Sequence, residues 1–237
     1  MKIFLVRIGA DQSEGGGGWN GPVNIQTGEF AYVPIPEDSR AYMLLPGYEK
    51  PYTGIVPALN RFNVELPEHL RTLNMHLDPD FSHLTYGDQG KKAAQLKDVS
   101  RGDWIVFYSG LRNIVGEHKL VYAFIGLLVV ESWEYAVRIP EKERDINAHT
   151  RRVLPGATDI VIRSQPEKSG RLKRCLPIGS YYDRAYRITP DILTEWGDLS
   201  TKNGYIQRSV RIPQVCDPNG FLRWWEKQAP VLIHENN

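Results

Sequence analysis

Four aspartates in two loop segments are the side chains in this sequence with the clearest potential for chemistry. Asp11 directly follows a short apolar run, and residues 77–88 contain Asp78, Asp80 and Asp88. A carboxylate just beyond the end of a buried strand is held rigidly and still reaches a cleft, where it can act as a general acid or base. Asp11 is therefore the first candidate for a catalytic residue, followed by the other three. The alternative for each is a turn aspartate that hydrogen-bonds its own backbone.

Residues suited to binding a nucleobase occur in the same two segments. Five of them offer an aromatic face or a side-chain amide: Gln12, Trp19, Asn20, Phe81 and Tyr86. Bases stack on aromatic rings with about 1–3 kcal/mol each, and amides hydrogen-bond base edges. The glycines at residues 15–18 would let the backbone approach a ligand closely, unless this loop has no role in binding. Because Pro22 follows where a dinucleotide motif would open a helix, we do not expect a Rossmann site.

The sequence contains no motif that is typical of a metal or cofactor site. The two cysteines, Cys175 and Cys216, are not in a ligand spacing, and no Walker A or HExxH pattern occurs. Residues 78–88 lack the spacing and the terminal glutamate of a calcium loop. His83 in this segment is by itself no evidence of a ligand, since a lone histidine is usually structural. We therefore expect neither a metal nor a cofactor.

Positive charge is concentrated in one part of the chain. The net charge of the whole chain is +1, but residues 151–187 contain nine Lys and Arg against three Asp and Glu. Seven of these residues are candidates for contacts with DNA phosphates: Arg151, Arg152, Arg163, Lys168, Arg171, Lys173 and Arg174. Basic groups gathered on one face neutralise phosphates and release counterions. The alternative is a solvated loop surface that balances acidic patches elsewhere.

The elements that would position these residues are mainly strands. Apolar and alternating runs predict strands at residues 2–8, 29–33, 103–108, 120–130 and 158–163. Helices are predicted at residues 68–75, 91–99, 141–152, 190–196 and 220–228. Gly126, inside the second strand of a long hairpin, predicts a bulge or bend. We expect an α+β fold in which a mostly antiparallel, curled sheet or small barrel carries peripheral helices.

Length and hydropathy place the chain among ordinary globular proteins. Its 237 residues fit a single domain over residues 1–237, since no linker or repeat divides the chain. The longest apolar stretch, residues 120–130, is far shorter than the about 20 residues of a membrane helix. The first residues lack the features of a signal peptide. We expect a cytoplasmic protein that does not bind membranes.

Residues 94–108, with the sequence AQLKDVSRGDWIVFY, resemble the helix–turn–strand entry of PUA-like domains, including the EVE and ASCH groups. In those domains a Gly-Asp turn leads into a buried strand of a small curled barrel. Here Gly102 and Asp103 would form that turn. The resemblance implies a PUA-like core at about residues 90–190.

More of the chain, from residue 1 to about 180, is similar to the third type of nucleotide modification associated domain of bacteria and phages. The similar segments are RIGAD (7–11), GWNGP (18–22), DPDF (78–81), TYGD (85–88), GD (102–103) and AH (148–149). This resemblance implies association with DNA that carries modified bases. Prokaryotic antiviral glycosylases that excise glucosylated hydroxymethylcytosine from phage DNA are similar as well.

These observations together predict a DNA glycosylase that excises a glucosylated hydroxymethylcytosine from double-stranded phage DNA and leaves an abasic site. The nucleotide would be flipped into a pocket between residues 9–22 and 77–88, and the basic segment would hold the phosphates. An aspartate would stabilise the oxocarbenium charge that develops on the sugar. The first alternative is a PUA/EVE-like reader that binds modified bases without cleaving them. The second is an enzyme that acts on free modified nucleotides.

Overall fold

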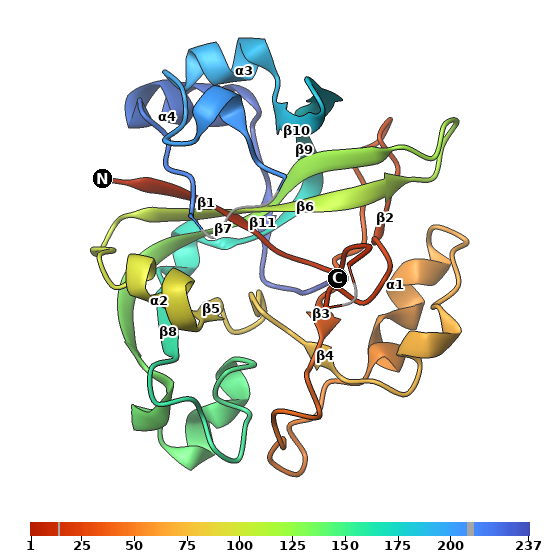
Figure 1. Ribbon diagram of the computed structural model, residues 1–237, viewed down its shortest axis with the longest axis vertical. Helices are drawn as coiled ribbons and strands as arrows, with labels where there is room; N and C mark the ends of the chain where they lie inside the picture. The colour runs from red at the N-terminus through yellow and green to blue at the C-terminus, as the bar shows by residue number, and fades with distance from the viewer. Residues whose placement is uncertain (14, 208–210) are drawn as a thin grey trace.

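A nine-stranded, mostly antiparallel sheet lies at the centre of the computed structural model, which describes residues 1–13, 15–207 and 211–237 (Figure 1). The sheet is built around a long hairpin of β6 (Trp104–Asn113) and β7 (Leu120–Tyr135). Strand β1 (Ile3–Arg7) runs parallel to β6, and the short β2 (Pro22–Val23) pairs with the far end of β6. The predicted hairpin and first strand are confirmed.

Strand β7 is long enough to pair with two further strands in succession. Its residues 122–127 pair with β9 (Gly170–Tyr182), and its residues 130–135 pair with β8 (Ile160–Ser164). The remaining strands of this sheet are added to β8 or β9, namely β5 (Thr85–Asp88), β10 (Ala185–Ile188) and β11 (Leu232–Ile233). A separate two-stranded sheet pairs β3 (Ile35–Pro36) with β4 (Met75–His76).

The central sheet is open, so the expectation of a PUA-like barrel is wrong. Strands β1 and β5 end the strand order and do not pair with each other. The outer edge of β1 is instead covered by the extended segment of residues 213–215. The backbone N–H of Leu5 donates to the carbonyl of Pro213, and the backbone N–H of Val215 donates to the carbonyl of Ile3. This segment satisfies the edge that a barrel would have used for closure. The α+β class, the mostly antiparallel pairing and the peripheral helices are confirmed.

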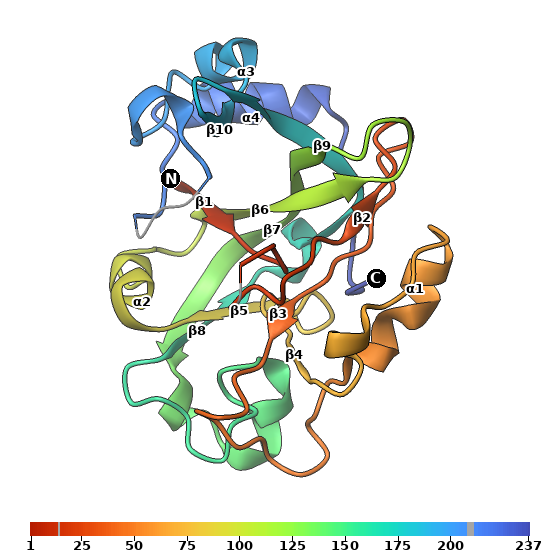
Figure 2. The same cartoon turned by 45° about the vertical axis from the view of Figure 1, so that its right-hand side comes forward.

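In the described part of the chain, four α-helices lie around the sheet: α1 (Val56–Asn60), α2 (Gly90–Leu96), α3 (Pro190–Glu195) and α4 (Pro218–Lys227). Helices α3 and α4 lie together at one end of the molecule, away from α1 (Figure 2). Short 3₁₀ turns occur at Tyr52–Ile55, Glu68–Leu70, Ala136–Arg138, Glu141–Ile146, Pro166–Lys168 and Lys202–Gly204. Among the described residues, none of the helices has the length and apolar character needed to cross a bilayer.

Three of the five predicted helices are confirmed, and two are reduced to short 3₁₀ segments. The predicted helix at 141–152 forms only the turn Glu141–Ile146, which has no buried residue and therefore no apolar face to pack. The predicted helix at 68–75 stops at Leu70, because Met75 and His76 are used by β4. The predicted strand at 29–33 forms only an isolated bridge between Phe30 and Val23.

The core occupies both faces of the central sheet. Phe4 and Val6 of β1 belong to one apolar cluster, whereas Ile3 and Leu5 belong to another. The first cluster includes residues of α2, and the second includes the aromatic side chains of α4. Because side chains alternate along a strand, β1 is buried on both faces, as its continuous apolar sequence predicts.

Two glycines shape the strands as the sequence predicts. Gly102 has a positive φ of 88°, and Asp103 accepts a hydrogen bond from the backbone of Ser100 at 2.9 Å, which makes the expected Gly-Asp turn. The register of β7 against β9 shifts between Phe124 and Gly126. A Cβ at Gly126 would lie 2.4 Å from ring atoms of Phe81, so only glycine lets this ring pack against the bend. The packing fixes residues 77–88 against the sheet.

Candidate active site

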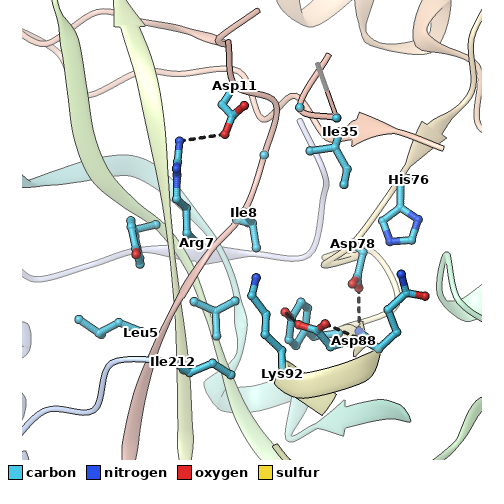
Figure 3. Close-up of a pocket in the computed structure, with 18 of the residues that line it drawn as sticks. Leu5, Arg7, Ile8, Asp11, Ile35, His76, Asp78, Asp88, Lys92 and Ile212 are labelled. Carbon is cyan, nitrogen blue, oxygen red and sulfur yellow. Dashed lines mark hydrogen bonds and ion pairs between the residues drawn. The ribbon is translucent and has the colours of Figure 1, made fainter. Parts of the chain in front are cut away.

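A cavity of about 770 Å³ brings the two predicted loop segments together (Figure 3). Asp11 and Ser13 line it from the first segment, and Asp78, Tyr86 and Asp88 line it from the second. The two segments meet because β1 leads into the first, while β5 carries the second along β8. Figure 3 shows Asp11 on one side of the cavity and Asp78 on another.

His76, Asp78 and His149 form a compact group in the wall of this cavity. One ligand atom of each side chain lies within 4.8 Å of those of the other two. Nε2 of His149 lies 3.8 Å from Oδ2 of Asp78. His76 ends β4 and Asp78 follows it, whereas His149 lies between a 3₁₀ turn and β8. These residue types can bind a metal ion or transfer protons.

The carboxylate of Asp78 is buried and held through one oxygen. Its Oδ1 accepts hydrogen bonds from the backbone of Gly87 at 2.8 Å and from Nδ2 of Asn147 at 2.7 Å. Burial raises the pKa of Asp78, although the nearby His149 and His76 and these hydrogen bonds act in the opposite direction. A Cβ at Gly87 would lie 2.5 Å from Cδ2 of His149, so glycine is required for the ring to sit here. The second oxygen, Oδ2, faces His149.

Each of the two histidines is oriented by its own carboxylate. Nδ1 of His76 is 2.7 Å from Oε2 of Glu37, and Nδ1 of His149 is 2.8 Å from Oδ2 of Asp159. Among the residues that the structure describes, Nε2 of neither ring has a hydrogen-bond partner. The two carboxylates thus engage Nδ1 of both rings and fix their orientation, which leaves Nε2 for chemistry.

One buried arginine connects these two carboxylates. The guanidinium of Arg152 is 3.0 Å from Oε1 of Glu37 and 3.1 Å from Oδ2 of Asp159, and it lies 3.4 Å from the ring centroid of Tyr42. Burial alone would raise the pKa of Glu37, but the hydrogen bond and charge of His76 together with Arg152 lower it to about 2. The pKa of Asp159 is lowered for the same reasons, by His149 and Arg152. Both carboxylates are therefore ionised near neutral pH.

The structure separates the four candidate aspartates. Asp11 lines the cavity, but it is paired with Arg7 at 3.0 Å and accepts a hydrogen bond from the backbone of Ser13, so it holds its loop in shape. Asp80 is buried away from the cavity lining. Asp88 lines the cavity and accepts a hydrogen bond from the hydroxyl of Tyr86. The side chain of Asp78 is only 5% exposed although it lines the cavity, whereas that of Asp11 is 19% exposed.

The residues predicted to bind a base are mostly used elsewhere. Tyr86 lines the cavity, with its ring packed edge-on against Phe107. Phe81 is fully buried in the core, and Trp19 packs against the apolar cluster around α1. Asn20 is buried and donates to the carbonyl of Gly110 at 2.8 Å, while Gln12 is exposed outside the cavity lining. The rest of the apolar wall is mainly aliphatic and also includes Tyr108; its aliphatic side chains are Leu5, Val6, Ile8, Ile35 and Ile212.

The basic segment does not form the expected cationic face. Arg151, Arg152 and Arg171 are buried, and the first two neutralise buried carboxylates. Arg163 is partly buried and pairs with Glu134 at 3.1 Å. The other three candidates, which are Lys168, Lys173 and Arg174, are exposed. The cationic residues that line the cavity come from other parts of the chain: Arg7, Lys91, Lys92 and Arg211.

Sequence reasoning missed most of the supporting residues of this site. His76, Glu37, Asn147 and Asp159 were not among the candidates, and His149 was noted only within a family-like segment. No spacing motif connects them, since they are spread over more than a hundred positions of the chain. The two histidines each lie within a few residues of a candidate or a carboxylate, but this pattern is too common to single them out.

The buried pair of Asp80 and Arg151 gives a prediction for acid stability. The burial of Asp80 would raise its pKa, but the hydrogen bond from His83 and the charge of Arg151 lower it from 3.8 to about 2. The stabilisation is therefore complete above about pH 4 and is lost as the pH falls towards 2, by about 2 kcal/mol. We expect Asp80→Asn to lower the free energy of unfolding at neutral pH by about 3 kcal/mol and to remove this acid-dependent loss.

Urea unfolding of both proteins over this pH range measures the effect. Asp38→Asn is the matched control, because Asp38 forms an exposed ion pair with Arg40 at 3.8 Å. Exposed pairs contribute little, so this change should alter the stability by less than about 0.5 kcal/mol. An equal loss of stability in acid for wild type and Asp80→Asn would contradict the assignment.

Comparison with known families gives one match over almost the whole chain. The family model described as nucleotide modification associated domain 3 matches residues 2–224. No significant match was found among curated proteins or among solved structures.

Proposed function

Because the chain belongs to the nucleotide modification associated domain 3 family, we propose that it is a hydrolase that excises a modified base from DNA by cleaving the N-glycosidic bond. The observation that carries this proposal is the buried carboxylate of Asp78, which faces His149 in the cavity wall. A protein that only recognises bases needs a pocket, but it does not need two oriented imidazoles and a buried carboxylate beside that pocket. Such groups are the usual means of activating water.

The cavity has the size and the lining that a flipped nucleotide requires. Its volume of about 770 Å³ lies within the range of about 300–1,000 Å³ for small-molecule sites. The aliphatic wall that includes Ile8 and Ile212 suits the flat face of a base. Asp88 and Gln89 offer hydrogen-bonding groups for the hydroxyls of an added sugar, and Lys91 and Lys92 offer positive charge for a phosphate. A base of this kind reaches the cavity after rotation out of the duplex.

The reaction proposed is a hydrolysis. The oxygen of a water molecule bonds to C1′ of the deoxyribose, the bond from C1′ to the base nitrogen breaks, and the base leaves with a proton from that water. Positive charge develops on the sugar ring in the transition state, and fixed negative charge nearby stabilises it. We assign activation of the water to the group of His76, Asp78 and His149. Asp88, in the same cavity, provides further negative charge.

Incubation with modified phage DNA tests this function. The substrate is phage DNA containing glucosylated hydroxymethylcytosine, and the control is the same sequence with unmodified cytosine. We expect alkali-labile abasic sites and the free modified base, detected by mass, only with the modified DNA. Binding of modified DNA without release of a base would favour a reader instead. Release of a base from free modified nucleotides but not from DNA would favour the nucleotide-level enzyme.

A further inference from the structure

We propose that His76, Asp78 and His149 bind one divalent first-row transition-metal ion. The donor set consists of two imidazole nitrogens and one carboxylate oxygen, all within 4.8 Å of one another. The ligands of a tetrahedral zinc ion, with bonds of about 2.1 Å, lie about 3.4 Å apart. The contact of 3.8 Å between His149 and Asp78 is already near this value, and side-chain shifts of about 1 Å bring in the third ligand.

The outer contacts of the three side chains are those of a metal site. Metal-binding histidines usually donate their second ring N–H to a carboxylate, which fixes the ring orientation. Here Glu37 serves His76 in this way, and Asp159 serves His149. The non-ligating oxygen of Asp78 is likewise held, by Gly87 and Asn147. Each of the three ligands therefore has its own support, and the remaining coordination positions face the cavity, where a water can bind.

The distances within the group argue against a centre that works by direct hydrogen bonds alone. At 3.8 Å, Nε2 of His149 and Oδ2 of Asp78 are too far apart for a hydrogen bond. His149 is only 3% exposed, and its Nε2 has no hydrogen-bond partner among the described residues. Since His149 lines the cavity, a ligand there can contact this ring. An ion between these atoms satisfies all three side chains at once.

Charge balance supports a divalent ion. Asp78, Glu37 and Asp159 contribute three negative charges to the group, and Arg152 contributes one positive charge. With both imidazoles neutral, as metal ligation requires, the net charge of the group is −2, and one divalent cation compensates it. Two imidazole ligands favour zinc, iron or another transition metal over magnesium or calcium, which prefer oxygen.

The role of the ion rests on the proposed function, but its binding does not. If the domain hydrolyses an N-glycosidic bond, the ion would lower the pKa of its bound water and so supply the nucleophile near neutral pH. The binding of the ion depends only on the side chains described above. The two proposals can therefore fail separately.

Titration of the metal-free protein with Co²⁺, followed by the visible absorption of the bound ion, and with Zn²⁺ by calorimetry tests the site. We expect one ion per chain. His76→Gln or His149→Gln should weaken binding at least about 100-fold, and Asp159→Asn, which keeps all three ligands, should weaken it about 10–100-fold. His118→Gln is the matched control, because His118 is exposed in the loop between β6 and β7 and should leave binding unchanged. Circular dichroism confirms that each variant is folded.

The outcomes separate the metal site from the enzymatic function. Saturable binding that is lost in both ligand variants supports the site, whether or not DNA is cleaved. Folded wild type that binds neither ion overturns the site, as does unchanged binding by His149→Gln. Base release by a protein that binds no ion would leave the proposed function standing without its metal. One bound ion with no base release from modified DNA would leave the site standing without the proposed function.

Discussion

Asp78→Asn is expected to reduce base excision by about 10³-fold while the domain remains folded. The asparagine keeps a carbonyl oxygen that can accept the hydrogen bonds from Gly87 and Asn147. It removes the negative charge that faces His149, and with it the ability to activate water or to bind an ion strongly. The rate of base release from modified DNA under single-turnover conditions measures the effect directly.

Asp11→Asn is the informative comparison, because the sequence alone places Asp11 first. In the structure its carboxylate is paired with Arg7 and with the backbone of Ser13, so we expect at most about a tenfold loss from a less ordered loop. A loss with Asp11→Asn that exceeds the loss with Asp78→Asn would contradict the assignment of the centre. If both variants lost only a small and equal part of the base-release activity, neither carboxylate would take part in the reaction.

Arg152→Met is expected to lower the free energy of unfolding by about 3–5 kcal/mol. Methionine has a similar length, but it leaves Glu37 and Asp159 ionised and buried without a cation between them. It also removes the contact of the guanidinium with the ring of Tyr42. Arg152→Lys should recover only part of the loss, because one ammonium cannot pair with two carboxylates as a planar guanidinium does.

Urea unfolding of the metal-free proteins measures this stability difference. Arg40→Met provides the control, since Arg40 is exposed and forms only a surface ion pair with Asp38. That change should stay within about 0.5 kcal/mol. If Arg152→Met were as stable as Arg40→Met, the charges of the two carboxylates would not need Arg152, and the charge balance drawn for the metal site would be wrong.

The strands that the sequence predicts correctly are those whose pattern is local. The continuous apolar run of β1 and the paired runs of β6 and β7 are visible in the amino-acid order, and Gly126 marks the bend in β7. Strand β9 was missed, because its charged residues and Pro177 interrupt any simple alternation. The burial of Arg171 at its start depends on contacts with residues near the end of the chain, which no local pattern reports.

The sequence allowed the carboxylate of the candidate site to be predicted, but not its two histidines. Asp78 belongs to a segment dense in polar side chains, which is a local signal. His149 comes next to Asp78 only because β5 pairs with β8, where Gly87 lies opposite Val161. The excess of positive charge in residues 151–187 can be read from the sequence, but the interactions that these side chains form cannot. An arginine on a DNA-binding surface and an arginine in a buried ion pair look identical in an amino-acid sequence. Only the tertiary structure distinguishes them.

The position of Arg152 has a consequence for how this centre assembles. Through its two ion pairs it joins the half that comes from the first third of the chain, Glu37 and His76, to the half that comes from beyond the middle, His149 and Asp159. No fragment that ends before residue 149 or begins after residue 76 holds both halves. Binding of an ion during refolding would therefore show that the two distant portions of the polypeptide have docked. A chain cut between them would regain the centre only if the two fragments reassociated.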